Sequence, residues 1–275
     1  MTSSSLELSD VNIDRGEKRL ISGINFYLNP GERVALLGAN GTGKSTFLDA
    51  LVGLHPLSGG FYSAFGRAVN NEADFRRLWS RIGLVFQDSD DQLFCPSVTD
   101  DVAFGPINLG YNPKQSRAIA LATLNKLGLG ELAERITYKL SGGEKRLVSI
   151  ATVLAMNPNI ILLDEPTTGL DENARQRLIE CLAELPQAML FTSHDQDLID
   201  RLASRAVLIK DGTLVNSILH KHPHIHIHSH THLHSEDDLT HPHPSDPDHI
   251  APDHSRDVHE EKIMPVSISG VTESH

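Results

Sequence analysis

The sequence predicts an α/β protein with a mostly parallel β-sheet, an antiparallel β portion at the N-terminus and an inserted helical subdomain. Short apolar runs alternate with helical segments along the chain, which is typical of a parallel sheet with helices on its faces. Two strands joined by a charged turn come first, and a helix-rich stretch over about residues 88–145 interrupts the alternation. With 39% hydrophobic residues, the chain can fold around a core.

The N-terminal elements follow from turn residues and apolar runs. Leu6–Ile13 and Ile21–Leu28 are predicted strands. A Pro-Gly turn leads into Arg33–Leu37, whose unbroken apolar run predicts a buried strand. A glycine-rich loop and then a helix over Lys44–Val52 are expected next.

The remaining elements alternate in the same way. Ile82–Phe86 is an apolar strand, and Pro113 opens a helix that runs to Leu127, since proline favours the first helical position. Strands and helices then follow in the order Ile160–Leu163, Glu172–Leu185, Ala188–Thr192, Gln196–Leu202 and Ala206–Ile209. An Asp-Gly turn makes a hairpin into Thr213–Ser217, where the globular pattern ends. We therefore expect a globular domain over residues 1–219 and a separate tail over residues 220–275.

The tail is expected to be disordered and to bind transition metals. It holds 14 of the 16 histidines, ten acidic residues against three basic ones, and few apolar residues, so it cannot bury enough surface to fold alone. Imidazole is a common ligand of nickel, cobalt, copper and zinc. The predicted ligands occupy every second position, at His220, His222, His224, His226, His228, His230, His232 and His234.

Composition excludes several classes of function. The formal net charge is −12, so no basic surface for nucleic acid is expected. No apolar run approaches the length of a membrane-spanning helix, and the first residues lack the features of a signal peptide. The two cysteines, Cys95 and Cys181, make no disulfide framework. We expect a soluble intracellular protein that serves a membrane only by docking to it.

A phosphate-binding loop is predicted after the strand that ends at Leu37. The sequence Gly-Ala-Asn-Gly-Thr-Gly-Lys-Ser matches the phosphate-loop pattern at every fixed position. Its glycines let backbone N–H groups wrap around phosphate oxygens, while Lys44 is expected to reach the β and γ phosphates of ATP and Ser45 to bind Mg²⁺. The predicted ATP-binding residues of this segment are Gly38, Ala39, Asn40, Gly41, Thr42, Gly43, Lys44, Ser45 and Thr46.

An acidic pair follows a second buried strand. Asp164 and Glu165 come directly after Ile160–Leu163. A carboxylate in this place can enter the Mg²⁺ shell, and its neighbour can polarise an attacking water. Together with the phosphate loop, the pair predicts nucleotide hydrolysis.

A third motif, Leu-Ser-Gly-Gly-Glu-Lys-Arg at residues 140–146, places a serine and two glycines at a predicted helix start. The backbone N–H groups at such a helix start form a second nest suited to phosphate, and an N-cap with a flexible approach is the alternative. The motif resembles the signature of ATP-binding-cassette (ABC) ATPases. The resemblance covers about residues 5–218, with the motifs in family order and at family spacing. It implies a P-loop ATPase core that hydrolyses ATP with Mg²⁺.

The resemblance also implies a role for each motif residue. Gln87 occupies the glutamine-loop position and would contact Mg²⁺ and the attacking water. Asp164 matches the magnesium-shell aspartate, and Glu165 matches the general base. Asp171 belongs to the dimer-interface loop. His194 matches the switch histidine that contacts the γ-phosphate.

The family works as dimers in which the signature of one subunit completes the nucleotide site of the other. By this resemblance, the residues that act in trans on a partner's γ-phosphate are Ser141, Gly142, Gly143 and Glu144. The chain carries one complete set of motifs. It therefore needs a second copy, or a paralogous ATPase, as its partner.

One position departs from the family pattern. The family usually stacks an aromatic ring on adenine, and the matching position here is Arg15. A guanidinium plane can also stack on a base, which makes Arg15 a further ATP-binding candidate. A solvated arginine is the alternative.

The segment after Gln87 indicates which kind of cassette this is. The runs Val-Phe-Gln-Asp-Ser-Asp-Asp-Gln-Leu-Phe at 85–94 and Asp-Val-Ala-Phe-Gly-Pro-Ile-Asn-Leu-Gly at 101–110 resemble ATPases of energy-coupling-factor importers, in particular the cobalt/nickel branch. This implies a transmembrane coupling subunit and a membrane substrate-binding subunit as partners. It also implies a peripheral location on the cytoplasmic face of the cell membrane.

The leading hypothesis is an ATPase subunit that powers import of nickel or cobalt. A zinc or manganese importer ATPase is the alternative within transport, because histidine tails suit those ions too. Outside transport, the alternatives are a soluble cassette ATPase acting on nucleic acid or ribosomes, or one with a metal-buffering tail. A metal-storage or chaperone protein is a further class, which the intact catalytic series disfavours. The sequence leaves open whether the tail takes part in transport or buffers metal beside it.

Overall fold

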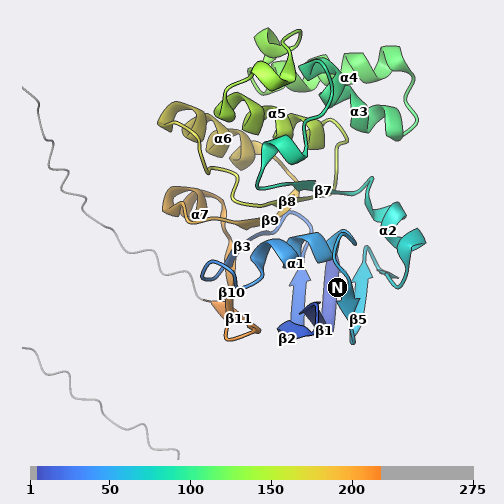
Figure 1. Cartoon of the computed structure of the whole chain (residues 1–275), viewed down its shortest axis with the longest axis vertical. Coiled ribbons are helices and arrows are strands. Elements are labelled where there is room, and N and C mark those ends of the chain that lie inside the picture. The colour runs from blue at the N-terminus through green and yellow to red at the C-terminus, as the bar shows by residue number, and fades with distance from the viewer. Residues whose placement is uncertain (1–4, 218–275) are drawn as a thin grey trace, which may run out of the picture. The chain divides into compact units, whose positions relative to one another are not determined.

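The computed structural model describes residues 5–217, which form two β-sheets with helices around them (Figure 1). The predicted disordered, metal-binding tail from residue 220 lies outside the described residues. Within them, the predicted α/β fold with an antiparallel N-terminal portion and an inserted helical region is confirmed. No helix within residues 5–217 is long and apolar enough to span a membrane.

The first sheet is antiparallel and comes from the N-terminal part of the chain. Its strands are β1 (Leu6–Arg15), β2 (Lys18–Leu28), β4 (Leu57–Ser58), β5 (Phe61–Ala64) and β6 (Arg67–Ala68). Their order is β2-β1-β5-β6, with β4 paired to β1. The sequence predicted β1 and β2 but not the three short strands. A glycine turn joins β4 to β5, where a Cβ on Gly60 would lie 2.3 Å from the Ser9 carbonyl oxygen.

The second sheet is parallel except at one edge. Its strands are β3 (Arg33–Leu37), β7 (Ile82–Val85), β8 (Ile160–Leu163), β9 (Ala188–Thr192), β10 (Arg205–Lys210) and β11 (Thr213–Ser217). Their order is β11-β10-β3-β9-β8-β7. Only the pair β10–β11, joined by the predicted Asp-Gly hairpin, is antiparallel.

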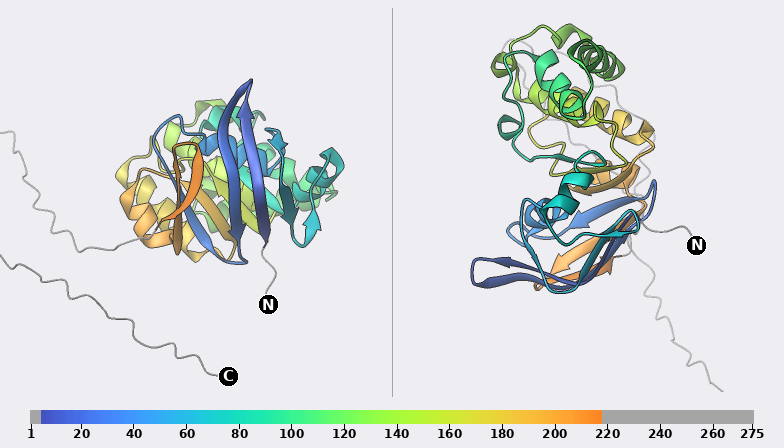
Figure 2. Two further views of the ribbon diagram at one scale, coloured as in Figure 1. Left: turned by 90° about the horizontal axis from the view of Figure 1, so that it is seen from below. Right: turned by 90° about the vertical axis from the view of Figure 1, so that its right-hand side faces the viewer.

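Helices cover this sheet and extend beyond it. They are α1 (Lys44–Leu51), α2 (Glu72–Leu78), α3 (Val98–Asn108), α4 (Pro113–Lys126), α5 (Gly142–Leu154), α6 (Glu172–Glu184) and α7 (Gln196–Leu202), with the short 3-10 helices η1 (Ser89–Asp91), η2 (Gly130–Leu132) and η3 (Thr137–Lys139). Asn112 caps α4 through a reciprocal capping box, with Pro113 at the first helical position. Figure 2 shows the helices α3–α5 and the antiparallel sheet at opposite ends of this body.

The central residues of the parallel strands are apolar because both faces of the sheet are covered there. Successive residues of β9 point to opposite faces. Leu190 belongs to the hydrophobic cluster that includes β1, β2 and α1, while Phe191 belongs to the cluster formed with α5, α6 and α7. A further cluster lies among α3, α4 and α5 and includes Val102, Leu124 and Val148. α5 therefore packs on the sheet with one side and on the helical region with the other.

This topology gathers the predicted motifs at one edge of the sheet. β3, β9, β8 and β7 are consecutive parallel neighbours, so the segments that follow their carboxyl ends meet there. The phosphate loop follows β3, Gln87 lies two residues after β7, Asp164 follows β8 and His194 lies two residues after β9. Residues far apart in the sequence thus become neighbours.

Candidate nucleotide site

The loop between β3 and α1 is shaped to hold an anion. Gly38 has φ 148°, and a Cβ there would lie 2.9 Å from both the Ile209 carbonyl oxygen and Thr42 Oγ1. Gly43 has φ 102° and occupies the N-cap of α1 without any side-chain cap. The first N–H groups of α1 are therefore left without a side-chain acceptor, and a phosphate oxygen can satisfy them.

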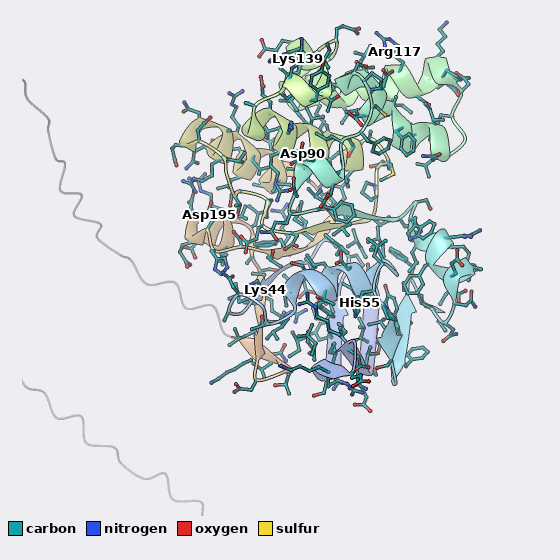
Figure 3. The ribbon with its side chains drawn as sticks, in the orientation of Figure 1. Lys44, His55, Asp90, Arg117, Lys139 and Asp195 are labelled. Atoms are coloured by element: carbon teal, nitrogen blue, oxygen red, sulfur yellow. The ribbon has the colours of Figure 1, made fainter. Side chains whose placement is uncertain are left out.

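Lys44 lies across this loop (labelled in Figure 3). Its ammonium donates to the Gly38 carbonyl oxygen at 2.8 Å and to the Ala39 carbonyl oxygen at 3.3 Å. Thr42 Oγ1 also donates to the Ala39 carbonyl oxygen, at 2.9 Å. Lys44 is 9% exposed, and no carboxylate of the described residues pairs with it. A buried positive charge held only by carbonyl oxygens favours a phosphate as its counter-ion.

A cavity of about 520 Å³ opens beside the loop. It brings together most of the predicted site: Arg15, Asn40, Gly41, Gly43, Lys44, Ser45, Thr46, Gln87, Asp164 and Glu165. Of the remaining predicted loop residues, Gly38 and Ala39 hold Lys44 through their carbonyl oxygens. The structure therefore brings the predicted phosphate loop, glutamine loop and acidic pair together around one cavity.

The acidic pair at the end of β8 is held by a chain of hydrogen bonds. Thr192 Oγ1 donates to Asp164 Oδ1 at 2.7 Å and accepts from the Glu165 backbone N–H at 2.8 Å. Asp164 and Glu165 are 6% and 8% exposed. The buried Glu165 Oε1 accepts no hydrogen bond from any described residue. A buried carboxylate oxygen without a hydrogen-bond donor is unfavourable, so this oxygen is available to accept a hydrogen bond from a bound molecule.

His194 connects the acidic pair to the phosphate loop. Its backbone N–H donates to Glu165 Oε2 at 3.3 Å, and its Nε2 lies 3.4 Å from Glu165 Oε1. The same Nε2 lies 3.1 Å from Asn40 Oδ1, a contact that requires Nε2 to carry the proton. The predicted switch histidine is therefore in the predicted site, bridging the segment after β9 and the segment after β3.

The described residues fit ATP and Mg²⁺. The glycine cradle and Lys44 offer N–H donors and positive charge to phosphates. Ser45 and Asp164 offer the hydroxyl and carboxylate oxygens that Mg²⁺ prefers. The unpaired Glu165 oxygen leaves an acceptor free for the proton of a water.

The signature residues lie elsewhere in the chain. Ser141 is the N-cap of α5, and with Glu144 it forms a reciprocal capping box. None of the residues 141–144 lines the nucleotide cavity of the described chain. A Cβ on Gly142 would meet nothing within 4 Å, and a Cβ on Gly143 would make only ordinary contacts. Packing within the chain therefore does not require either glycine.

Asp171 has a local structural task. Its Oδ1 accepts the Ala174 backbone N–H at 2.9 Å, which caps α6. The predicted place of Asp171 in a dimer interface stays a prediction. The predicted tail ligands lie outside the described residues. Within residues 5–217 the structure contains no group of three or more His, Cys, Asp or Glu arranged to hold a metal ion.

Three cavity residues were not predicted from the sequence: Leu20, Asp49 and His55. His55 (labelled in Figure 3) donates from Nε2 to the Asp14 carbonyl oxygen at 2.7 Å, which places it beside Arg15. The available signal was that His55 and His194 are the only histidines before the tail. Asp49 follows Ser45 by four residues, so helical spacing puts both on one face of α1.

Replacing Asp49 by asparagine is expected to stabilise the ligand-free protein at pH 7. Burial, and then the nearby Asp164, raises the pKa of Asp49 above its ordinary value of 3.8. The folded state then holds this proton more tightly than the unfolded state, so stability is lost as pH rises through the raised pKa. Asparagine removes that loss. Thermal unfolding from about pH 3 to pH 7 checks this: the two proteins should converge at the acid end, and a less stable variant at pH 7 would contradict it.

This fold carries a phosphate loop, an acidic pair, a glutamine loop and a signature motif. Together these features define an ATP-binding-cassette ATPase. The sequence profile of the ABC transporter family matches residues 21–168, and the chain belongs to this family. It is an ATP-hydrolysing subunit of an ABC transporter. Proteins of this family act on ATP with Mg²⁺, dimerise and pair with transmembrane subunits.

Particular relatives agree with this class. A Brucella suis biovar 1 protein named as an ABC transporter ATP-binding protein is 48% identical over 217 residues, covering 79% of this chain and 90% of that protein. The nickel import ATP-binding protein NikO of Rhodobacter capsulatus is 42% identical over 203 residues, covering 70% and 80%.

Solved structures share the fold. CbiO1 of Clostridium perfringens, part of the ABC transporter complex CbiONQ, gives a TM-score of 0.70 at 32% identity, covering 77% of this chain and 87% of that chain. A dimeric, post-hydrolysis structure of the ATP-binding cassette MJ0796 with ADP and phosphate gives 0.69 at 26% identity, covering 76% and 96%.

Proposed function

We propose that this chain lies on the cytoplasmic face of the membrane and powers import of a transition metal ion, nickel or cobalt, into the cell. The main support for this proposal is the sequence and the structure of the segment after Gln87. This segment resembles the cobalt/nickel branch in sequence, and in the structure its residues contribute to the lining of a largely apolar cavity. The nickel-import relative and the CbiONQ component support the same choice.

The proposed chemistry is hydrolysis of ATP by one activated water. Lys44 and the loop N–H groups would bind the phosphates, and Ser45, Asp164 and Gln87 would hold Mg²⁺, which would neutralise phosphate charge. The water attacks the γ-phosphorus, the bond to the β,γ-bridging oxygen breaks, and the proton of the water passes to Glu165. We assign the contact with the γ-phosphate to His194, which bonds to Glu165 and Asn40 at the nucleotide cavity.

We further propose that two copies of the chain form the working pair. Each copy carries one complete set of motifs. Gly142 and Gly143 lie at the N-terminus of α5, where the chain itself leaves space for a Cβ, so close approach of another molecule is a reason for glycine there. The dimeric structure of a similar single cassette supports this arrangement. Two copies then share two nucleotide sites, each completed by the partner's signature.

The largely apolar cavity is suited to a membrane subunit. It has a volume of about 520 Å³ and is lined by residues of α2, β7, α3 and α5 and of the segment between β7 and α3, including Phe94 of that segment and Phe104 of α3. These two rings are 65% and 45% exposed and pack edge to face, with centroids 4.9 Å apart. Exposed aromatic side chains gathered around a hollow are typical of a protein–protein contact. The predicted transmembrane coupling subunit is the partner that we place here.

Gln92 connects this cavity to the glutamine loop. Its side chain lines the cavity, donates to the Ser149 carbonyl oxygen at 2.8 Å and to Thr152 Oγ1 at 2.7 Å, and accepts the Phe86 backbone N–H at 3.2 Å. Phe86 directly precedes Gln87. An occupant that moves Gln92 therefore also moves the loop that reaches the nucleotide cavity.

The identity of the cargo is tested by metal uptake in a strain that lacks this gene. Cells that carry the gene should take up nickel or cobalt in excess of the deletion strain, and an excess of the other ion of this pair should compete. Zinc and manganese should compete weakly. Uptake that responds to zinc or manganese instead would replace the proposal by the alternative importer, and equal nickel and cobalt uptake in both strains would contradict it.

Deleting residues 220–275 is expected to leave basal ATP turnover intact and to remove bound nickel, because the alternating imidazoles are the proposed ligands. Nickel titration at pH 7.5 and again below about pH 6, where imidazoles protonate, checks this. Binding to the full chain should weaken at the lower pH. Nickel binding that survives the deletion would exclude the tail as the site.

A further inference from the structure

Arg146 is a buried cation without an acidic partner. It lies in the second turn of α5, two residues after the Gly142–Glu144 segment of the signature, and it is 3% exposed. No carboxylate of the described residues lies within ion-pair distance of its guanidinium. Burial lowers its pKa, and the carboxylates of Asp164, Glu165 and Asp88 act against this shift. Something other than an ion pair must stabilise this charge.

The guanidinium bonds to backbone carbonyl oxygens of two different loops. Nε donates to Pro166 at 3.0 Å, and Nη2 donates to Asp164 and to Glu165, each at 2.5 Å. Nη1 donates to Gln87 at 3.2 Å and to Phe86. A guanidinium has five N–H groups, and all of them are used here. Three acceptors follow β8 and two follow β7.

These acceptors belong to the proposed catalytic segment. Glu165 has φ 46°, in the left-handed region that a non-glycine residue rarely occupies. Its backbone N–H is held by Thr192 Oγ1 and its carbonyl oxygen by Arg146. The two bonds fix the peptide groups on both sides of this strained residue. Its carboxylate is thereby aimed at the nucleotide cavity that it lines.

We propose that Arg146 is a positioning residue that ties the glutamine loop and the catalytic segment to the signature helix α5. The proposal rests on the proposed catalytic role of Glu165. Arg146 does not line the nucleotide cavity, and it acts only by fixing the backbone at Phe86–Gln87 and Asp164–Pro166. It thereby keeps Glu165 and Gln87 in a set relation to each other and to the signature that serves the partner's site.

Only a planar fork of donors can do this. A lysine at this position keeps the charge but has three donors on a single atom, so it cannot reach carbonyl oxygens on both loops in the same geometry. Arg146→Lys therefore removes the tie between the loops with the least disturbance of charge. Arg146→Met would leave five buried carbonyl oxygens unpaired, and loss of the fold could then hide the effect.

The test compares Arg146→Lys with Arg33→Lys in the full chain. Arg33 is a matched control because its Nη2 also donates to two carbonyl oxygens, those of Ala183 and Leu185, at 2.8 and 2.7 Å. It lies at the start of β3, the end of the strand away from the phosphate loop. We expect Arg146→Lys to lower kcat by about tenfold or more while the ATP dissociation constant changes by less than about threefold. Arg33→Lys should change neither by more than about twofold.

Three outcomes would overturn the proposal: unchanged kcat in Arg146→Lys, a parallel loss of kcat and ATP affinity, or failure of Arg146→Lys to fold where Arg33→Lys folds. The last would make Arg146 a determinant of the fold instead of the catalytic geometry. Melting temperatures of both variants distinguish these cases.

A double variant separates this proposal from the proposed function. Glu165→Gln keeps the backbone carbonyl oxygen that Arg146 holds. If Arg146 acts through Glu165, adding Arg146→Lys to Glu165→Gln should cause little further loss of turnover. Multiplied losses would overturn the positioning role. Undiminished turnover in Glu165→Gln alone would contradict the proposed function itself, whereas normal turnover in Arg146→Lys beside a defective Glu165→Gln would contradict only the positioning role.

Discussion

Replacing Glu165 by glutamine is expected to lower kcat for ATP hydrolysis by about a hundredfold to ten-thousandfold, the range that a lost general base costs. Glutamine has nearly the same shape but cannot accept the proton of the attacking water. The phosphate loop does not depend on the Glu165 side chain, so ATP should bind with nearly unchanged affinity. Phosphate release at saturating Mg²⁺ and ATP, together with equilibrium ATP binding, measures both quantities.

The control for this variant is Glu184→Gln, at the exposed end of α6. It should leave both quantities unchanged, because it changes the charge of the protein by the same amount outside the cavity. Turnover in Glu165→Gln at the rate of this control would exclude Glu165 as the general base. The unpaired Oε1 would then need another explanation.

Replacing Lys44 by alanine is expected to weaken ATP binding by about tenfold to a hundredfold, the value of a charge-assisted hydrogen bond lost from a buried site. Lys44 is the buried cation of the loop, and its ammonium also bonds to the carbonyl oxygens of Gly38 and Ala39. Turnover at limiting ATP should fall in proportion. Equilibrium binding of ATP and of ADP measures the change.

Lys210→Ala is a suitable control, since Lys210 is an exposed lysine at the end of β10. Unchanged ATP affinity in Lys44→Ala would contradict the phosphate-binding role of the loop. The two principal variants are also expected to differ in kind: Glu165→Gln should lose turnover and keep ATP binding, whereas Lys44→Ala should lose ATP binding. A shared loss of both in both variants would indicate general damage to the site.

The long apolar strands and the motifs that follow them could be predicted from the sequence. β3, β8 and β9 are rich in apolar residues because alternate side chains of each strand pack into the hydrophobic clusters on the two faces of the sheet. Parallel order then brings the following segments together, and this is why residues as distant as Asn40 and His194 meet. The apolar pattern of each strand, together with the rule that parallel strands end at the same edge of a sheet, was sufficient to predict this part of the fold.

The region from Gly53 to Arg81 could not be predicted in this way. Its strands β4, β5 and β6 are two to four residues long, too short to show a period. These strands form because β4 and β5 pair with the edge of β1 that β2 leaves unpaired, and β6 pairs with β5. The start of α2 does carry a local signal, since Asn71 and Asp74 form a reciprocal capping box.

Arg146 was visible in the sequence only as the last residue of the signature. Its acceptors are backbone carbonyl oxygens, which any residue supplies and no sequence pattern marks. They lie 18 to 60 residues away along the chain. Asp49 and His55 escaped prediction for a similar reason, because their place in the cavity depends on contacts with Asp164 and Asp14 that only the fold creates.

Two copies of this chain, in our proposal, complete each other's ATP sites. Co-expression of a Lys44→Ala subunit with a Gly143→Arg subunit checks this, at a limiting ATP concentration at which each variant alone has little turnover. In a mixed dimer, one site has both defects, while the other combines an intact Lys44 with an intact signature. Random pairing should therefore restore about a quarter of the turnover of the unmodified dimer. A mixture as inactive as its two components would contradict the claim.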